Sequence, residues 1–208
     1  MEDNKFELKF TKFFDVKSPI GISQRENADL EFQSIGIDIY MPKPTMTFIN
    51  GIVESNKKYV LGEIHKNNEG IIEHFSINEN DSIKVFYQDN KYIIYDRMQI
   101  PSGIGILIPN GYHIDFRSKS SNFKNDYTSV TGLIDCDYTF GMGIQLVPYN
   151  NKITLQVDEK VSQIVLIKSV EITRLDEISL EEWSKIGDVV ARRLSRTGGF
   201  GSTNKFDK

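Results

Sequence analysis

The sequence predicts an all-β protein with one short helix near its C-terminus. Short apolar or alternating segments recur along the 208 residues, and turn-forming residues separate them. This spacing is typical of a β-sandwich, jelly roll or barrel rather than of alternating βαβ units. The predicted strands are Phe6–Phe13, Ile35–Met41, Tyr59–Ile64, Ile71–Phe75, Ser82–Tyr87, Lys91–Tyr95, Gly105–Ile108, Tyr112–Arg117, Met142–Val147, Lys152–Val157 and Val161–Ile172.

Two chain reversals are predicted between these strands. Asp89-Asn90 separates two apolar runs and is suited to a two-residue hairpin turn. Pro109-Asn110-Gly111 combines three residues that favour turns, so the chain is expected to reverse there as well.

The one predicted helix begins at Ser179. Ser179 and Glu182 form a capping box, in which each side chain bonds to the other residue's backbone N–H. Apolar residues at helical spacing follow and end near Leu194; they are Trp183, Ile186, Val190 and Leu194. The helix should therefore set the point where the glycine-rich arm, residues 195–208, begins.

Composition excludes several classes of protein. The net charge is −4, so no bulk positive charge favours nucleic acid or an anionic membrane. No apolar run reaches transmembrane length, and the acidic start lacks the apolar core of a signal peptide. The single cysteine, Cys136, excludes an internal disulfide. We expect a cytoplasmic protein, or one in the host cytoplasm if its source is a virus.

The C-terminal arm carries a cluster of groups suited to a nucleotide. Its glycines expose backbone N–H groups, and Arg196, Ser202 and Thr203 add donors that suit phosphate. Phe200 lies among them without an apolar neighbour in the sequence. The pattern predicts a flexible arm that closes over a nucleotide, with the base on the ring and the phosphates on the donors.

Two further segments in the middle of the chain favour the same chemistry. Asp135 and Asp137 share one face if the backbone is extended, and two neighbouring carboxylates are costly to bury together. The segment 115–121 gathers two cations and three hydroxyls, a composition suited to phosphate oxygens. Each segment alone is also compatible with an ordinary solvated loop or turn.

Taken together, these segments resemble the trimeric dUTP pyrophosphatase (dUTPase) family, whose five motifs are present in order. They are Gly36-Ile37-Asp38-Ile39-Tyr40, Arg117-Ser118-Lys119-Ser120, Gly132-Leu133-Ile134-Asp135-Cys136-Asp137-Tyr138, Glu159-Lys160-Val161-Ser162-Gln163-Ile164 and Gly198-Gly199-Phe200-Gly201-Ser202-Thr203. The resemblance implies a distorted jelly-roll subunit with a C-terminal arm. It also implies a homotrimer in which each active site takes motifs from three chains.

The resemblance also implies a reaction and its residues. dUTP would be hydrolysed to dUMP and pyrophosphate, with Asp135 as the general base that activates water. Mg²⁺ would be chelated by the triphosphate and reach the protein through water, with Asp38 and Asp137 in supporting roles and no direct protein ligand. The implied substrate-binding residues are Arg117, Ser118, Lys119, Ser129, Leu133, Ile134, Tyr138, Gly143, Gln163, Arg196, Phe200, Ser202 and Thr203.

Within that set, a β-hairpin around Leu133, Ile134 and Gly143 would recognise uracil through backbone groups. Tyr138 would pack under the deoxyribose and exclude a ribose 2′-hydroxyl. Phe200 would stack on the base. Nucleic acid and membrane are not expected as partners.

The chain departs from the family pattern at several positions. Lys119 replaces a glycine, and its charge lies beside the phosphates or else turns outward. Phe140 also replaces a glycine, and Arg196 lies one position later than the usual arm arginine. The excess length between motifs one and two, about residues 42–90, is interpreted as an inserted surface β-hairpin region within a 1–194 domain. A regulatory or partner-binding role for this insertion is an alternative to a purely structural one.

Two other functions compete with dUTP hydrolysis. A dCTP deaminase of the same fold is disfavoured because Gln145 occupies the position of that family's glutamate base, and an amide cannot act as a base. A catalytically idle nucleotide-binding regulator is disfavoured because the motif residues are intact. A zinc site is not expected, since the three histidines are scattered along the sequence and there is only one cysteine.

Overall fold

The structure, a computed structural model, describes residues 8–21, 36–130, 132–138 and 140–170, together with residues 177, 179, 181, 182 and 185. The chain divides into two compact units, Met1–Val170 and Glu171–Lys208. The last strand of the first unit ends at Lys168, and the expected start of the arm at residue 195 falls within the second unit and stays a prediction.

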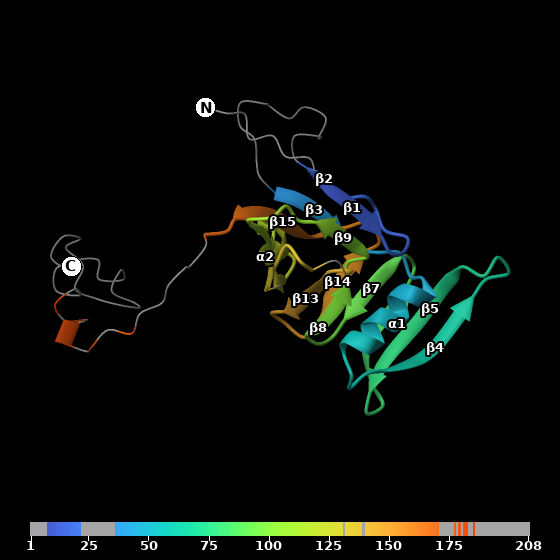
Figure 1. The fold of residues 1–208 in the computed structure, drawn as a ribbon. Helices are drawn as coiled ribbons and strands as arrows, with labels where there is room; N and C mark the ends of the chain where they lie inside the picture. The colour runs from blue at the N-terminus through green and yellow to red at the C-terminus, as the bar shows by residue number, and fades with distance from the viewer. Residues whose placement is uncertain are drawn as a thin grey trace. The chain divides into compact units, whose positions relative to one another are not determined.

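The first unit is built almost entirely of antiparallel β-sheet (Figure 1), so the predicted all-β, jelly-roll-like class is confirmed. Its strands are β1 (Lys9–Lys12), β2 (Ile20–Gly21), β3 (Gly36–Tyr40), β4 (Val60–Lys66), β5 (Ile72–Glu79), β6 (Ser82–Gln88), β7 (Lys91–Ile94), β8 (Met98–Pro101), β9 (Ile104–Leu107), β10 (Tyr112–Arg117), β11 (Tyr127–Val130), β12 (Leu133–Ile134), β13 (Gly143–Pro148), β14 (Ile153–Gln156) and β15 (Lys160–Lys168). In the described part of this unit two helices, α1 (Met46–Ser55) and α2 (Ser120–Lys124), lie between strands.

The strands form four sheets. One five-stranded sheet has the order β12-β10-β15-β3-β2 and holds most of the motif residues. A second five-stranded sheet has the order β14-β7-β6-β5-β4. A three-stranded sheet, β11-β13-β8, and the pair β1-β9 complete the unit. The apolar side chains of these sheets meet in one buried core.

Both predicted reversals are present. At Asp89 and Asn90 the φ angles are 52° and 62°, and the flanking residues Gln88 and Lys91 pair across β6 and β7. Two successive positive φ angles define the hairpin turn that matches strand twist. At the second reversal Gly111 has a φ of 79°, and Tyr112 N donates to Pro109 O at 3.1 Å.

The segment 42–90 differs from the expected surface hairpin. It contains the ten-residue helix α1, and its strands β5 and β6 are interior strands of the sheet completed by β7 and β14. The helix was missed because its sequence contains β-branched residues and Gly51, which have low helix propensity. Tertiary packing compensates for this, as Phe48, Ile49 and Ile52 are fully or almost fully buried.

Both ends of α1 are held by side chains. Thr45 Oγ1 accepts a hydrogen bond from Phe48 N at 3.2 Å and so caps the start of the helix. At the other end Asn56 Nδ2 donates to Gln99 O, and Asn56 Oδ1 accepts from Gln99 N. These bonds tie the helix to β8, so the segment is an integral part of the first unit.

The second unit confirms the start of the predicted C-terminal helix. Ser179 N donates to Glu182 Oε2 at 2.9 Å, and Glu182 N donates to Ser179 Oγ at 3.2 Å. These are the reciprocal bonds of a capping box, and Glu181, Glu182 and Lys185 are helical. The apolar stripe of this helix and the glycine-rich arm lie outside the described residues. Among the described residues, no helix is both long and apolar enough to cross a bilayer.

If α1 is part of the core, truncating its central aromatic should destabilise the whole first unit. Phe48 is fully buried, and its ring lies 5.7 Å from the rings of Phe14 and Tyr92. We expect Phe48→Ala to lower the free energy of unfolding by about 3–5 kcal/mol, measured by chemical denaturation. Phe123→Ala, at a ring that is 59% exposed, is the matched control and should cost far less. Equal losses in the two variants would contradict the core position of α1.

Candidate functional site

Residues from three motifs lie in one row across the sheet that contains β15. Gln163 on β15 pairs with Asp38 on β3 and with Arg117 on β10. Residues directly opposite one another in antiparallel strands share a face. The fold therefore brings together parts of motifs one, two and four, which are far apart in the sequence.

Asp38 is the buried member of this row, and two lysines hold its carboxylate. Lys119 Nζ bonds to Asp38 Oδ1, and Lys160 Nζ lies 2.9 Å from Asp38 Oδ2. Only 1% of the Asp38 surface is exposed. Burial alone would raise the pKa of this carboxyl, but the hydrogen bonds and charges of the two lysines outweigh it and hold the pKa below its ordinary value.

This pairing settles the orientation of Lys119. The sequence left open whether its charge lies beside the phosphates or turns outward. The structure shows a third arrangement, in which the ammonium group turns inward onto Asp38 and the side chain is only 17% exposed. An uncompensated buried carboxylate is costly, which explains why two cations converge on it.

The Gln163 side chain lies over Gly36, a position on β3 that has no side chain. A Cβ added at Gly36 would lie 2.7 Å from Gln163 Oε1, which is closer than real Cβ contacts. Gly36 thus leaves room for the Gln163 amide on this face. Next to it Arg117 is exposed, and its Nε donates to Asp115 Oδ2 at 2.8 Å.

A buried network of polar side chains supports the second motif. Ser118 Oγ accepts from Ser129 N and from Asn122 Nδ2, both at 3.2 Å. Asn122 Nδ2 also reaches Val161 O at 2.9 Å, and Ser162 Oγ donates to Arg117 O at 3.1 Å. These bonds connect β10, α2, β11 and β15, so the motif-two backbone is fixed to motif four.

Ser129 belongs to this network rather than to an exposed surface. The sequence comparison with the family implied that Ser129 binds substrate. Its side chain is only 2% exposed, and its hydroxyl lies 3.2 Å from Ser162 Oγ. In this structure Ser129 therefore holds the Ser118 hydroxyl in place through its backbone N–H.

The third motif lies at the edge of the same sheet. Leu133 pairs with Asp115 and Ile134 pairs with Ile114, which makes β12 the neighbour of β10. The chain then turns at Asp135–Tyr138, where Tyr138 N donates to Asp135 O at 3.1 Å. The condition under which Asp135 and Asp137 would share one face, an extended backbone, is thus not met, and both residues are exposed as expected.

The β-hairpin expected around Leu133, Ile134 and Gly143 does not appear in the described pairings. β12 pairs with β10, whereas β13, which carries Gly143 and Gln145, pairs with β8 and β11 in another sheet. The segment that connects β12 to β13 is bonded to β9 and to the residues between β8 and β9. Met142 N donates to Ile104 O, and Ser102 N donates to Met142 O. Gly143 faces the Gln99 side chain.

An aromatic pair lies next to the turn. The Tyr138 ring is 5.9 Å from the Phe140 ring in an edge-on arrangement, and the Tyr138 hydroxyl donates to Gly141 O at 3.1 Å. Tyr138 is 41% exposed and Phe140 is 72% exposed. Phe140, the departure from the family glycine, therefore extends the apolar surface around Tyr138.

Asp135 follows β12 at the edge of the sheet, whereas Arg117, Gln163 and Asp38 lie on β10, β15 and β3. In the β10–β12 register Leu133 pairs with Asp115 and Ile134 pairs with Ile114, so β12 approaches Asp135 in the direction that leads away from Arg117. The described residues of one chain thus present motif three and the row of motifs one, two and four in different parts of this sheet. Arg196, Phe200, Ser202 and Thr203 lie outside the described residues.

Two of the histidines that are scattered along the sequence meet in the fold. His65 on β4 and His74 on β5 pair directly across the strands, and Glu63 lies beside them. Sequence separation concealed this, because the β4–β5 hairpin brings the two histidines together. His113 lies on β10, and its Nδ1 is 2.9 Å from Ser169 Oγ.

The chain is similar in sequence to curated bacterial enzymes named deoxyuridine 5′-triphosphate nucleotidohydrolase. The relative from Wolbachia pipientis is 30% identical over 115 residues, which cover 53% of this chain and 69% of that protein. The relative from Finegoldia magna is 28% identical over 146 residues, covering 67% and 95%. No protein-family model matches the chain.

Solved dUTPases are also found among structural neighbours. A mutant dUTPase of staphylococcal phage 80alpha has a TM-score of 0.49 and 15% identity, and the match covers 97% of this chain and 99% of that one. A mutant dUTPase from phage phi11 of Staphylococcus aureus, described with a structural Mg(II) ion, has a TM-score of 0.48 and 14% identity over 85% of this chain and 99% of that one.

The structure thus defines an all-β protein in which residues from motifs one, two and four lie on one face of a single sheet. On the evidence of its sequence relatives, the chain belongs to the dUTPase family.

The charges at Asp38 generate a pH-dependent prediction. Because the pKa of Asp38 is lowered, its ionised form stabilises the fold above about 3.8, and this contribution is lost as the pH falls through the folded-state pKa. Lys119→Met removes one of the two ammonium groups that stabilise the ionised Asp38 carboxylate. Burial, which favours the protonated form, then has the larger effect, so the pKa of Asp38 should rise. We expect a loss of about 1.5–3 kcal/mol at neutral pH, with the difference from the wild type shrinking as the pH falls below about 4.

Thermal denaturation from about pH 7 to about pH 3 measures this difference. Lys152→Met, at an exposed lysine before β14, is the charge-matched control and should show neither effect. A Lys119→Met variant with the wild-type stability at neutral pH would contradict the assigned role of this pair.

Proposed function

We propose that this protein hydrolyses dUTP to dUMP and pyrophosphate by attack of water on the α-phosphate. The observation that carries the proposal is the row formed by Asp38, Gln163 and Arg117, in which strand register aligns three motifs of the family. The names of the curated relatives support the same reaction.

Asp135 is the proposed general base. Its carboxylate is exposed at the start of a turn, where a water molecule can reach it. Asp135 would accept a proton from that water while the oxygen forms a bond to the α-phosphorus. The bond from the α-phosphorus to the bridging oxygen then breaks, and pyrophosphate leaves with the electron pair. A positioned base of this kind contributes about 10²–10⁴-fold to the rate.

Arg117, Ser118 and Gln163 are the proposed triphosphate ligands. The Arg117 guanidinium is exposed and provides charged donors for phosphate oxygens. Ser118 Oγ already accepts two hydrogen bonds from within the protein, which leaves its own O–H available to donate to a phosphate oxygen. Lys119 would bind phosphate only by leaving Asp38, which links substrate binding to the buried carboxylate.

The side chains fit a Mg²⁺ ion held mainly by the substrate. Both oxygens of Asp38 are already engaged by lysine ammonium groups, so this carboxylate suits a supporting role better than direct ligation. Asp137 adds exposed carboxylate oxygens, which suit hydrogen bonds to the water molecules that a bound Mg²⁺ ion usually keeps. When bound, the ion would neutralise charge on the triphosphate.

Tyr138 and the adjoining strand are the proposed nucleoside-binding part. The half-exposed Tyr138 ring offers a flat apolar surface for the deoxyribose. Leu133 and Ile134, with Gly143 on the next sheet, would present backbone groups to uracil. Because the described β12 and β13 belong to different sheets, this pocket would be formed between sheets rather than within one hairpin.

We further propose a homotrimer with active sites shared between chains. The family resemblance implies this assembly, and the β10–β12 register, which directs motif three away from Arg117, supports it. Parts of a site that do not meet in one chain can meet when symmetry brings neighbouring chains together. The C-terminal arm would supply Arg196, Phe200, Ser202 and Thr203 to such a site.

Substitution of the proposed base tests the reaction. We expect Asp135→Asn to lower kcat for dUTP by roughly 10²–10⁴-fold with little change in binding, because the amide cannot accept the proton. Pyrophosphate release should be measured in parallel with dUTP, dCTP, dTTP and UTP. Asp137→Asn is the matched control and should retain more activity. Unchanged turnover by Asp135→Asn would show that the base is wrongly assigned, and deamination of dCTP would indicate a different enzyme.

Mixed assemblies test the shared site. Asp135→Asn and a variant truncated after Leu194 should each be nearly inactive, while co-refolded mixtures should regain activity at about a quarter of the sites if Asp135 and the arm act from different chains. No recovery in mixtures, or a monomer by light scattering, would contradict the shared site.

Phe200→Ala should weaken dUTP binding by about 1–3 kcal/mol without lowering the Tm.

A further inference from the structure

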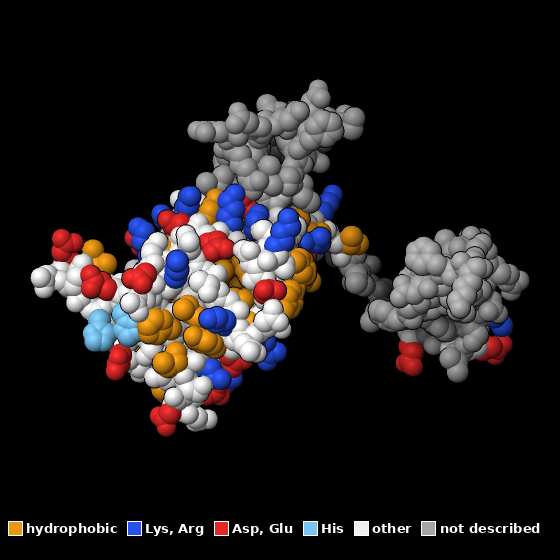
Figure 2. All heavy atoms as spheres, turned by 180° about the vertical axis from the view of Figure 1, so that it is seen from behind, with side chains coloured by type: hydrophobic (Ala, Val, Ile, Leu, Met, Phe, Trp, Pro, Cys, Tyr) orange, Lys and Arg blue, Asp and Glu red, His pale blue; other side chains and the backbone are white. Residues whose placement is uncertain are grey.

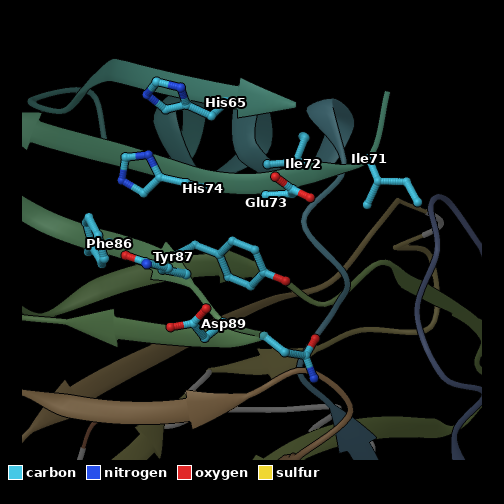
Figure 3. A pocket seen from close by; sticks show the side chains of 10 residues that line it. His65, Ile71, Ile72, Glu73, His74, Phe86, Tyr87 and Asp89 are labelled. Carbon is cyan, nitrogen blue, oxygen red and sulfur yellow. The ribbon is translucent and has the colours of Figure 1, made fainter. Parts of the chain in front are cut away.

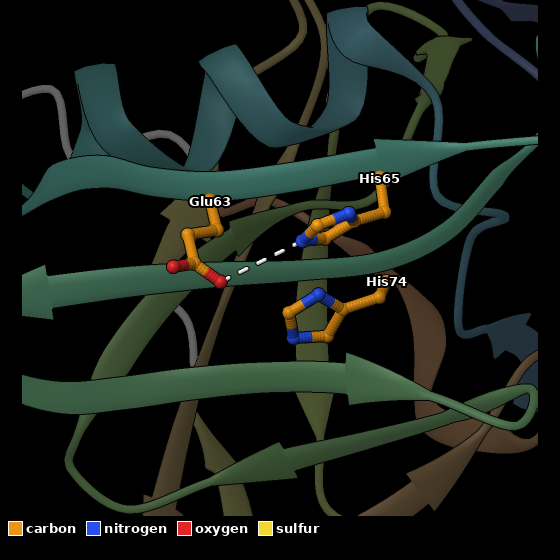
Figure 4. A group of neighbouring side chains, drawn as sticks. All are labelled: Glu63, His65 and His74. Carbon is orange, nitrogen blue, oxygen red and sulfur yellow. Dashed lines mark ion pairs between the residues drawn. The ribbon is translucent and has the colours of Figure 1, made fainter.

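Three potential metal ligands gather on the sheet that contains the 42–90 segment. Glu63, His65 and His74, here called the histidine cluster, each offer one ligand atom, and these atoms all lie within 4.8 Å of one another. Figure 4 shows the two imidazole rings close together, with the Glu63 carboxylate pointing toward His65. In Figure 2 histidine side chains lie side by side on the surface, next to a hydrophobic patch.

Strand geometry accounts for this arrangement. Glu63 and His65 are two residues apart on β4, so they point to the same face of the sheet. His74 is the direct partner of His65 on β5, and their ring centroids are 5.1 Å apart. The next residue, Phe75, points to the opposite face and is fully buried. The histidine cluster therefore lies on the side of the sheet away from the core.

One ring of the histidine cluster is oriented by packing. His74 is half-buried, and its ring lies 4.6 Å from that of Phe86 on the neighbouring strand β6. The side chains of His65 and Glu63 are 64% and 77% exposed, and their Nε2 and Oε2 atoms are 3.6 Å apart. The cluster thus combines one positioned imidazole with two side chains that are free to adjust.

These ligands and distances match a particular class of ion. Zinc binds imidazole nitrogen and carboxylate oxygen at about 2.0–2.2 Å, and tetrahedral geometry then places ligand atoms about 3.3 Å apart. The 3.6 Å separation of His65 Nε2 and Glu63 Oε2 is close to this value. Magnesium prefers oxygen ligands in an octahedral arrangement, so imidazole pairs select against it.

An open cavity adjoins the histidine cluster. It has a volume of about 890 Å³ and is lined by His65 and His74 together with Glu73, Phe86, Tyr87 and Asp89. In Figure 3 both imidazole rings lie beside this space. Three protein ligands leave one tetrahedral position vacant, and the cavity gives water or another small ligand access to it.

We propose that Glu63, His65 and His74 form a binding site for a divalent transition-metal ion of the zinc type. The ion would connect the edge strand β4 to β5 and leave its fourth position toward the cavity. This site is independent of the described residues proposed for catalysis and substrate binding, none of which lies on this sheet.

Calorimetric titration of the metal-free, full-length protein with ZnCl₂ tests the site. The titration should be done in a Cys136→Ser background, because a half-buried thiol is another zinc ligand. We expect one zinc ion per chain. His65→Ala and His74→Ala should each weaken affinity by more than the roughly 10–100-fold that outer partners of metal ligands typically cost.

Four controls make the result specific. His113→Ala removes a histidine outside the cluster and should bind zinc like the parent protein, as should Asp135→Asn. Excess Mg²⁺ should not displace zinc. Zinc should also raise the Tm of the parent protein but not that of the His65→Ala/His74→Ala double variant, whose metal-free Tm should match the parent. Absence of zinc binding, or equal binding by the double variant, would overturn the proposal.

Discussion

The burial of Asp38 between Lys119 and Lys160 is the interaction on which the arrangement of the site depends. A carboxylate on an interior strand is tolerated only where cations meet both of its oxygens. This requirement constrains the register of β3 against β15, because a slip by one residue would turn Asp38 to the other face. The same register places Gln163 beside Asp38 and opposite Arg117, so the charge compensation of Asp38 and the alignment of the three motif residues have one origin.

Motif residues were the part of the site that sequence could predict, since each lies within a short local pattern. Asp135 and Tyr138 are at an exposed turn, and Arg117 and Gln163 are on strands predicted nearly to their observed bounds. The inward turn of Lys119 could not be predicted, because it depends on the cost of burying a carboxylate from a distant strand. The arm and its residues Arg196 and Phe200 remain predictions.

The 42–90 segment shows a different limit. Its alternating apolar residues correctly predicted strands, but the helix α1 forms against its intrinsic propensity because Phe48 and its neighbours fill the core. The strands β8 and β11 were also missed, since they are short and complete a sheet around β13. Likewise, His65 and His74 become neighbours only through the β4–β5 register. Long-range pairing of this kind leaves no local signal in a single sequence.

The irregular pairing of β4 has a consequence for how copies of the molecule can associate. β4 is the last strand of its sheet, and its register against β5 shifts twice, between Leu61 and Ile64 and between His65 and Lys66. Irregularities of this kind twist an edge strand and interrupt its row of unpaired backbone groups, and charged side chains add to the effect. β4 is therefore a poor template for an added strand from another molecule. The histidine-bearing end of the protein can remain open to solvent without promoting edge-to-edge aggregation.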